Sequence, residues 1–119
     1  MIKIGKNISE FSVYSCQPKN KDELKEIIEK RISKEGNNCD LNDIDVSLIE
    51  DMSYLFSFSS FSGDISKWNV SNVIDMIHMF RDCKSFNSDL SKWNVSSVID
   101  MTGMFKNSGM KKIPNWYRD

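Results

Sequence analysis

Hydrophobic and polar residues follow one pattern twice in the central part of this chain. Residues 61–85 and 86–110 align without a gap and share fourteen identical positions, so the repeat is twenty-five residues long. A third, more divergent copy precedes them, in which residues 44–56 correspond to residues 68–80 at a spacing of 24. A repeat of this length predicts a stack of similar units, because a single unit cannot bury its own hydrophobic face.

The first half of each unit, FSGDISKW or FNSDLSKW, alternates hydrophobic and polar residues. Ile65 and Leu90 lie on one side of this alternation, and the other side carries Asp64, Ser66, Asp89 and Ser91. A period of two residues predicts a short, half-buried β-strand in each unit.

The second half of each unit has the form Asp-Met-x-x-Met-Phe. Met76, Met79 and Phe80 stand at positions i, i+3 and i+4, which places them on one face of a helical turn. The aspartate before the first methionine is the expected N-cap, because its side chain can accept hydrogen bonds from the free N–H groups of a helix start. The three predicted N-caps are Asp51, Asp75 and Asp100.

Together these elements predict an α+β repeat fold, a short leucine-rich-repeat-like solenoid with one short parallel strand and one helical turn per unit. Its Trp, Val, Met and Phe positions are expected to form ladders in the interior. Trp68 and Trp93 should stack one above the other, with Trp116 at the end of the column. We place three units in residues 42–110.

Residues 1–41 have the properties of an N-terminal cap for such a stack. A strand is expected at residues 11–15 and a helix at about residues 21–35. Asn20 is the predicted N-cap and Glu23 holds the capping-box position. The expected hydrophobic stripe of the helix is Leu24, Ile27, Ile28 and Ile32.

Residues 111–119 are the expected C-terminal cap, because Pro114 cannot donate a hydrogen bond to a further strand. The whole chain is therefore expected to form one domain, made of an N-terminal strand–helix cap, three repeat units and a short C-terminal cap.

The composition narrows the functional classes. The 119 residues are 39% hydrophobic and 28% charged, which is typical of a globular domain. A formal net charge of −1 offers no electrostatic attraction for nucleic acid or an anionic membrane. No hydrophobic run approaches the roughly 20 residues of a membrane-spanning helix, and the start does not resemble a signal peptide. We expect a cytoplasmic protein for the chain as given, or a cell-surface protein if a leader was removed.

Residues with catalytic or metal-binding chemistry are few. Cys16, Cys39 and Cys83 fit no zinc spacing, and we expect reduced thiols that pack like small hydrophobic residues. A disulfide between two of them, or a reactive Cys16, is the alternative. His78 is the single histidine and is expected on the surface of a helix. We predict no catalytic site, no metal site and no cofactor.

The polar residues that face outward from the predicted strands are the better candidates for function. Stacking would align them into a small face of mixed charge that suits a protein contact. They are Ser62, Asp64, Ser66, Lys67, Asn87, Asp89, Ser91 and Lys92. Within this face, Asp64 and Asp89 would stand about 5 Å apart, which makes a calcium site the alternative.

Tyr54, Phe58 and His78 are further candidates for a partner contact. Tyr54 and Phe58 do not align with core positions, so they are expected either as exposed interface anchors or in contact with the N-terminal helix. His78 occupies the position of Tyr54 in the preceding unit.

The motif W-N-V-S-N-V-x-D-M-x-x-M-F, followed by F-x-x-D-L-S-x-W, resembles the repeats of the BspA-like leucine-rich-repeat proteins of bacteria over residues 42–110. The helix sequence DELKEII and the closing IPNWY also resemble the flanks of such arrays. The resemblance implies a right-handed solenoid with a protein-binding role. Members are often displayed on the cell surface, and some are associated with attachment to host proteins or to other cells.

The leading hypothesis is a non-enzymatic module that recognises a protein partner, with an intracellular partner as the first expectation. One alternative is a surface-adhesin-related domain that binds host or neighbouring-cell proteins. Another is a structural unit that self-associates through its ends. We expect a monomer or weak self-association, without nucleic-acid binding or membrane insertion.

Overall fold

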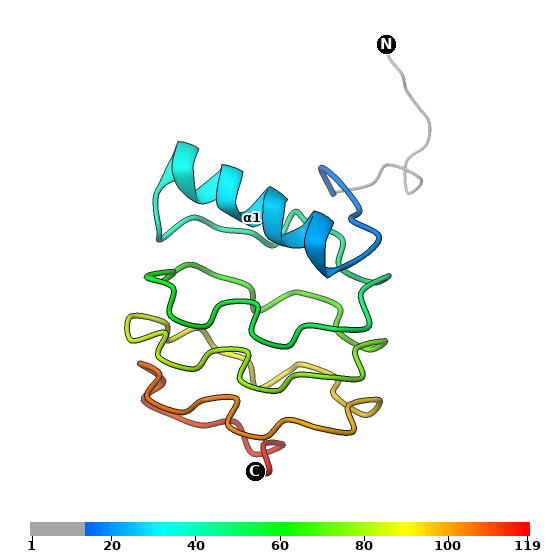
Figure 1. The fold of residues 1–119 in the computed structure, drawn as a ribbon, viewed down its shortest axis with the longest axis vertical. Coiled ribbons are helices and arrows are strands. Elements are labelled where there is room, and N and C mark those ends of the chain that lie inside the picture. The colour runs from blue at the N-terminus through cyan, green and yellow to red at the C-terminus, as the bar shows by residue number, and fades with distance from the viewer. Residues whose placement is uncertain (1–13) are drawn as a thin grey trace.

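The computed structural model describes residues 14–119, which form a stack of coils beneath a single helix (Figure 1). Helix α1 spans Lys21–Glu35 and lies across one end of the stack, and the C-terminus lies at the other end. The strand expected at residues 11–15 falls largely outside the described residues. Just after it, Cys16 forms an isolated parallel bridge with Ile44.

Helix α1 begins and ends where the capping residues predict. The Oδ1 atom of Asn20 accepts a hydrogen bond of 2.9 Å from the backbone N–H of Glu23. The Glu23 carboxylate accepts in return from the N–H of Lys19, one residue before the N-cap. Gly36 ends the helix with a φ of 95°, a conformation that favours glycine. The predicted stripe faces the stack, with Leu24 and Ile28 buried and Ile27 and Ile32 partly buried.

The predicted helical turns are wrong. In residues 51–58, 75–82 and 100–107, which we call the ladder segments, φ becomes positive at every fourth residue. It is 60° at Tyr54 and 61° at Phe58, and the later segments repeat this at His78, Asp82, Gly103 and Asn107. An α-helix needs negative φ at every residue, so these positions prevent one. The three aspartates that were expected as N-caps instead form local turns, in which the Oδ1 atom accepts a hydrogen bond of 2.8–3.0 Å from the backbone N–H two residues further on. They are Asp51, Asp75 and Asp100.

The ladder segments join neighbouring coils. Alternate N–H groups of one segment donate to carbonyl groups of the next, as Met52 does to Asp75 and Phe56 to Met79, each at 2.9 Å. The second segment repeats this pattern onto the third, with Phe80 donating to Met104 at 2.9 Å. The coils therefore run parallel, 23 or 24 residues apart in these bonds. In this register, Asp75 forms one isolated parallel bridge with Asp51 and another with Asp100.

The predicted strands are replaced by isolated parallel bridges within residues 14–119. Asp64 pairs with Asp40, and immediately afterwards a tight turn closes with a 3.1 Å bond from the N–H of Trp68 to the carbonyl of Ile65. Such turns interrupt strand pairing. The predicted alternation is nevertheless confirmed as a pattern of burial, with Phe61, Gly63 and Ile65 buried and Ser62 and Asp64 exposed.

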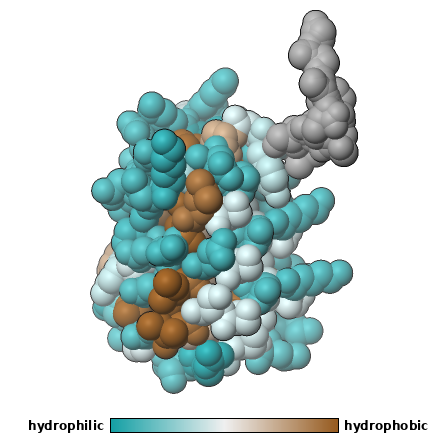
Figure 2. Space-filling model, turned by 90° about the vertical axis from the view of Figure 1, so that its right-hand side faces the viewer, coloured by the Kyte–Doolittle hydropathy of each residue, from teal (hydrophilic) through white to brown (hydrophobic). Residues whose placement is uncertain are grey.

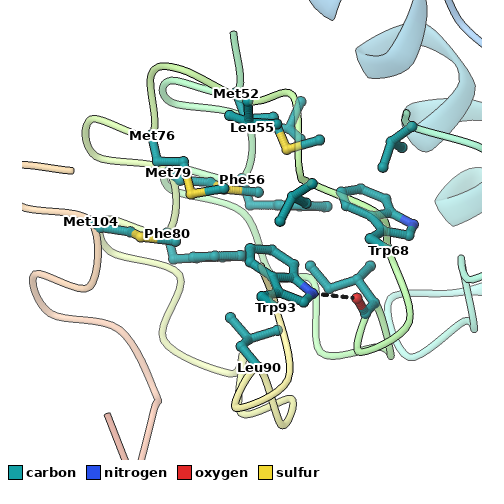
Figure 3. Packing of buried hydrophobic residues seen from close by; sticks show 14 of the residues in the cluster. Met52, Leu55, Phe56, Trp68, Met76, Met79, Phe80, Leu90, Trp93 and Met104 are labelled. Carbon is teal, nitrogen blue, oxygen red and sulfur yellow. Dashed lines mark hydrogen bonds between the residues drawn. The ribbon is translucent and has the colours of Figure 1, made fainter. Parts of the chain in front are cut away.

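Aromatic side chains form columns through the interior of the stack (Figure 3). Phe56, Phe80 and Phe105 are nearly parallel, and consecutive ring centroids are 5.6 Å apart. No direct ring contact joins Trp68 to Trp93 in the described part of the chain, contrary to the predicted stacking. Each instead tilts against a phenylalanine, Phe56 at 6.0 Å and Phe80 at 6.4 Å respectively.

The tryptophans are placed by hydrogen bonds between coils. The indole N–H of Trp93 donates to the carbonyl of Ile65 at 3.1 Å, and that of Trp116 donates to Leu90 at 2.8 Å. Trp116 stacks on Trp93 with centroids 6.3 Å apart, so this last contact of the predicted tryptophan column is confirmed although Trp68 is not part of it. The methionines of the repeat are core residues, as predicted, with Met52, Met76, Met79, Met101 and Met104 buried.

Candidate polar binding face

The outward polar residues of successive coils lie together around two neighbouring hollows, which we call the polar face. The first hollow, of about 310 Å³, is lined by Asn38, Ser62, Gly63, Asp64, Ser66, Ser85, Asn87, Ser88 and Asp89. The second, of about 300 Å³, is lined by residues 87–91 and 112–115, including Ser91 and Lys112. The structure thus groups six of the eight predicted strand residues, while Lys67 and Lys92 are exposed outside these linings.

The first hollow exists because the coils separate on this side. The N–H groups of Ser62 and Asp64 donate to the coil above, to Asn37 at 2.8 Å and Cys39 at 3.3 Å. The equivalent N–H groups of Asn87 and Asp89 have no partner among residues 14–119. The connection from Phe80 to Phe86 has one residue more than that from Phe56 to Phe61. The change in repeat spacing from 24 to 25 residues falls at this hollow, whose size is decided by the separation of the coils.

Hydrogen bonds hold the carboxylates of the first hollow in place. The Oδ1 atom of Asp64 accepts from the backbone N–H of Ser66 at 2.8 Å and from the hydroxyl of Ser88 at 3.4 Å. These donors lower the pKa of Asp64, because they stabilise the ionised form. The backbone N–H of Ser91 lowers the pKa of Asp89 in the same way. The hollow therefore holds two ionised carboxylates at neutral pH, and no lysine or arginine lines it.

Acid should weaken the fold through these aspartates. Their folded-state pKa values are lowered, so their stabilisation is present above the unfolded pKa of about 3.9 and is lost as the pH falls toward the folded values. We expect the free energy of unfolding, measured by urea denaturation between pH 7 and pH 3, to fall in this range. The double substitution Asp64→Asn and Asp89→Asn keeps the accepting Oδ1 atoms and should flatten the curve. An unchanged curve, or one equally flattened by Glu29→Gln on α1, would contradict this assignment.

The three remaining candidates lie on the ladder segments, away from the linings of the polar face. Tyr54 is 48% exposed and Phe58 is 70% exposed, which agrees with the first of the two alternatives, exposed rings. The guanidinium carbon of Arg81 lies 5.8 Å from the centroid of the Phe58 ring. Phe58 is therefore an exposed ring already in contact with a cation.

The expectation that His78 lies on a helix is wrong. Its backbone has a φ of 51°, and its ring meets that of Tyr54 edge-on with centroids 5.1 Å apart. A Cβ atom on Gly103 would lie 2.3 Å from Cδ2 of His78, so glycine at that position leaves room for the ring. The buried Nδ1 atom of His78 has no hydrogen-bond partner in the described structure.

The cysteines form no disulfide among residues 14–119. Cys16, Cys39 and Cys83 are unpaired, and burial raises the pKa of Cys83 to about 11. Residues 14–119 contain no group of three or more His, Cys, Asp or Glu side chains that could hold a metal ion. Within the same residues, no helix is long and apolar enough to span a membrane.

Comparison with known proteins relates most of this structure to one family. The family model described as "Mycoplasma protein of unknown function, DUF285" matches residues 23–117, which include nearly all of α1, every coil and the C-terminal Trp116 and Tyr117. Searches of curated proteins and of solved structures each found no match. The chain therefore belongs to the family described as Mycoplasma protein of unknown function, DUF285.

Proposed function

We propose that this protein is a non-enzymatic protein-binding module, a leucine-rich-repeat-like solenoid in which α1 caps one end. The parallel coils and the aromatic columns support this classification, as does the resemblance of the repeat to BspA-like proteins. In such folds, side chains from successive repeats form one continuous surface for a partner.

The observation that carries the proposal is the polar face. Equivalent residues from two coils, such as Asp64 and Asp89 or Ser62 and Asn87, line one hollow. The unpaired N–H groups of Asn87 and Asp89 add backbone donors next to the carboxylate acceptors. A polypeptide carries both carbonyl acceptors and cationic side chains, so it matches this set of donors and acceptors.

Self-association through the ends of the stack is less well supported. Leu24 and Ile28 of α1 are buried at one end. At the other end, the Tyr117 ring packs on Phe105 with centroids 5.1 Å apart. Both ends are therefore covered by the protein's own side chains.

Fractionation of native cells would distinguish a surface-adhesin-related role from recognition of an intracellular partner.

Affinity capture from native lysate tests the proposal, provided that the bait is compared with matched variants. We expect at least one partner to be captured by the wild type and lost with Asp64→Lys combined with Asp89→Lys. The control, Glu26→Lys combined with Glu29→Lys, makes the same charge change on exposed positions of α1 and should retain the partner. Circular dichroism verifies that both variants fold. Capture of no specific partner, or equal loss in both variants, would argue against the polar face as a binding surface.

A further inference from the structure

An exposed hydrophobic stripe runs along a different side of the stack (Figure 2). Ile74 and Ile99 occupy equivalent positions in adjacent coils, and the N–H of Ile99 donates to the carbonyl of Ile74 at 2.8 Å. Their side chains are 39% and 82% exposed, and Ile99 is the most exposed large hydrophobic residue in the described part of the chain. The equivalent position in the first coil is Glu50.

An acidic row accompanies this stripe, because an aspartate follows each of these positions. In Asp75 and Asp100, the Oδ1 atom accepts from the N–H two residues on, at 2.9 and 3.0 Å. Their Oδ2 atoms have no hydrogen-bond or ion-pair partner among residues 14–119. The exposed isoleucines thus stand beside carboxylate oxygens that remain available.

The first coil shows what such an aspartate binds. The ammonium group of Lys21, at the start of α1, lies 3.3 Å from Oδ2 of Asp51, and it also donates to the hydroxyl of Ser53 at 3.0 Å and to the Ser53 carbonyl at 3.1 Å. Asp100 and Thr102 repeat this pair two coils further on, with the Thr102 hydroxyl bonded to Oδ1 of Asp100 at 2.7 Å. The carbonyl of Thr102 already accepts from His78, so the carboxylate and the hydroxyl remain for a cation approaching from solvent.

The stripe ends in a hollow of about 350 Å³, lined by Ile99, Asp100, Met101, Thr102, Arg118 and Asp119. The two end residues of the chain are engaged: the Arg118 guanidinium donates to the carbonyl of Val98 at 3.4 Å, and Asp119 accepts from the N–H of Gly103 at 2.8 Å. Asp100 and Ile99 therefore line one hollow together with Arg118, whose guanidinium is engaged by the Val98 carbonyl.

We propose that Ile74, Ile99, Asp100 and Thr102 form a second docking surface, for a protein segment that presents a lysine or arginine next to an aliphatic side chain. The cation binds Oδ2 of Asp100 and the hydroxyl of Thr102, as Lys21 binds Asp51 and Ser53. The aliphatic side chain covers Ile99 and Ile74, removing hydrophobic surface from water. This inference extends the proposed protein-binding function to a separate surface and to one class of partner sequence.

The test is a titration of the ¹⁵N-labelled full chain with three short peptides, in which the amide signals of the protein are recorded by NMR. The probes are acetyl-Leu-Lys-Leu-Lys-amide, its Glu counterpart with both lysines replaced, and acetyl-Ser-Lys-Ser-Lys-amide. We expect the first peptide to shift the amide signals of Ile99, Asp100 and Thr102 and the other two to have much smaller effects. Absence of these shifts, or equal shifts with the Glu or Ser peptide, would overturn the proposal.

Variants test the assignment of the cation site. Asp100→Asn keeps the Oδ1 acceptor for the Thr102 N–H and should weaken peptide binding by up to about fivefold, the upper end of the range for an exposed ion pair. Glu29→Gln is the matched control, because it removes one exposed carboxylate on α1, outside both surfaces, and should leave binding unchanged. Unchanged affinity in Asp100→Asn would refute the assignment of the cation site. The proposed function is tested separately, by capture of a lysate partner that depends on Asp64 and Asp89. A negative peptide titration therefore refutes the second surface alone and leaves the proposed function to its own test.

Discussion

Replacing Trp93 with alanine should lower the free energy of unfolding by about 3–5 kcal/mol, the range for large-to-small substitutions of buried aromatic residues. The Trp93 side chain is buried and lies between Phe80 and the stacked ring of Trp116. Its removal leaves a cavity at the junction of two coils and also deletes the indole bond to the Ile65 carbonyl. That carbonyl still accepts from the N–H of Trp68, so lost packing is the main cost.

The measurement is urea or thermal unfolding of the two proteins under identical conditions. Phe58→Ala is the matched control, because it removes an aromatic ring that is 70% exposed and in contact with Arg81 alone among the ring contacts of the described structure. It should cost no more than about 1 kcal/mol, the value of an exposed cation–π contact. A loss below about 1 kcal/mol in Trp93→Ala would show that Trp93 is not a core residue.

Replacing Gly63 with alanine should be the next most damaging change, at a cost of about 1–3 kcal/mol for overpacking of a close-packed interior. A Cβ atom there would lie 1.8 Å from the carbonyl oxygen of Cys39 and 2.8 Å from Cε1 of Phe61. The Cys39 carbonyl is part of the backbone and accepts from the N–H of Asp64, so it cannot move aside cheaply. The first two coils would have to separate at the bridge between Asp40 and Asp64.

Ser88 provides the control within the same chain, because it occupies the position of Gly63 in the next unit. The coils are already apart at Ser88, where the first hollow opens, so a side chain is accommodated. Ser88→Ala should change stability by less than about 0.5 kcal/mol. The measurement is the free energy of unfolding in urea. If Gly63→Ala lowered it as little as Ser88→Ala, this would contradict the close approach of the first two coils at Gly63.

The polar face could be predicted from the sequence only in part. Its residue types could be predicted, since alternation separated Asp64 and Asp89 from the buried Ile65 and Leu90. Its hollows could not, because their size depends on how far one coil stands from the next. The exposure of Ile99 could not be predicted either, because two adjacent β-branched residues, Val98 and Ile99, are typical of a buried segment, whereas only Val98 is buried.

The sequence by itself determined the repeat, the capped helix α1 and the burial of the Trp, Val, Met and Phe positions that the units share. These depend on local features: the Asn20 cap, the period of hydrophobic residues and the recurrence of the same residues in each unit. Only the tertiary structure decided the backbone conformation of the ladder segments. Met76, Met79 and Phe80 are buried together both in a helical turn and in consecutive tight turns, so their spacing does not distinguish the two. The choice is made by alternate N–H groups that bond to the next coil, which is a contact between residues 23 or 24 positions apart.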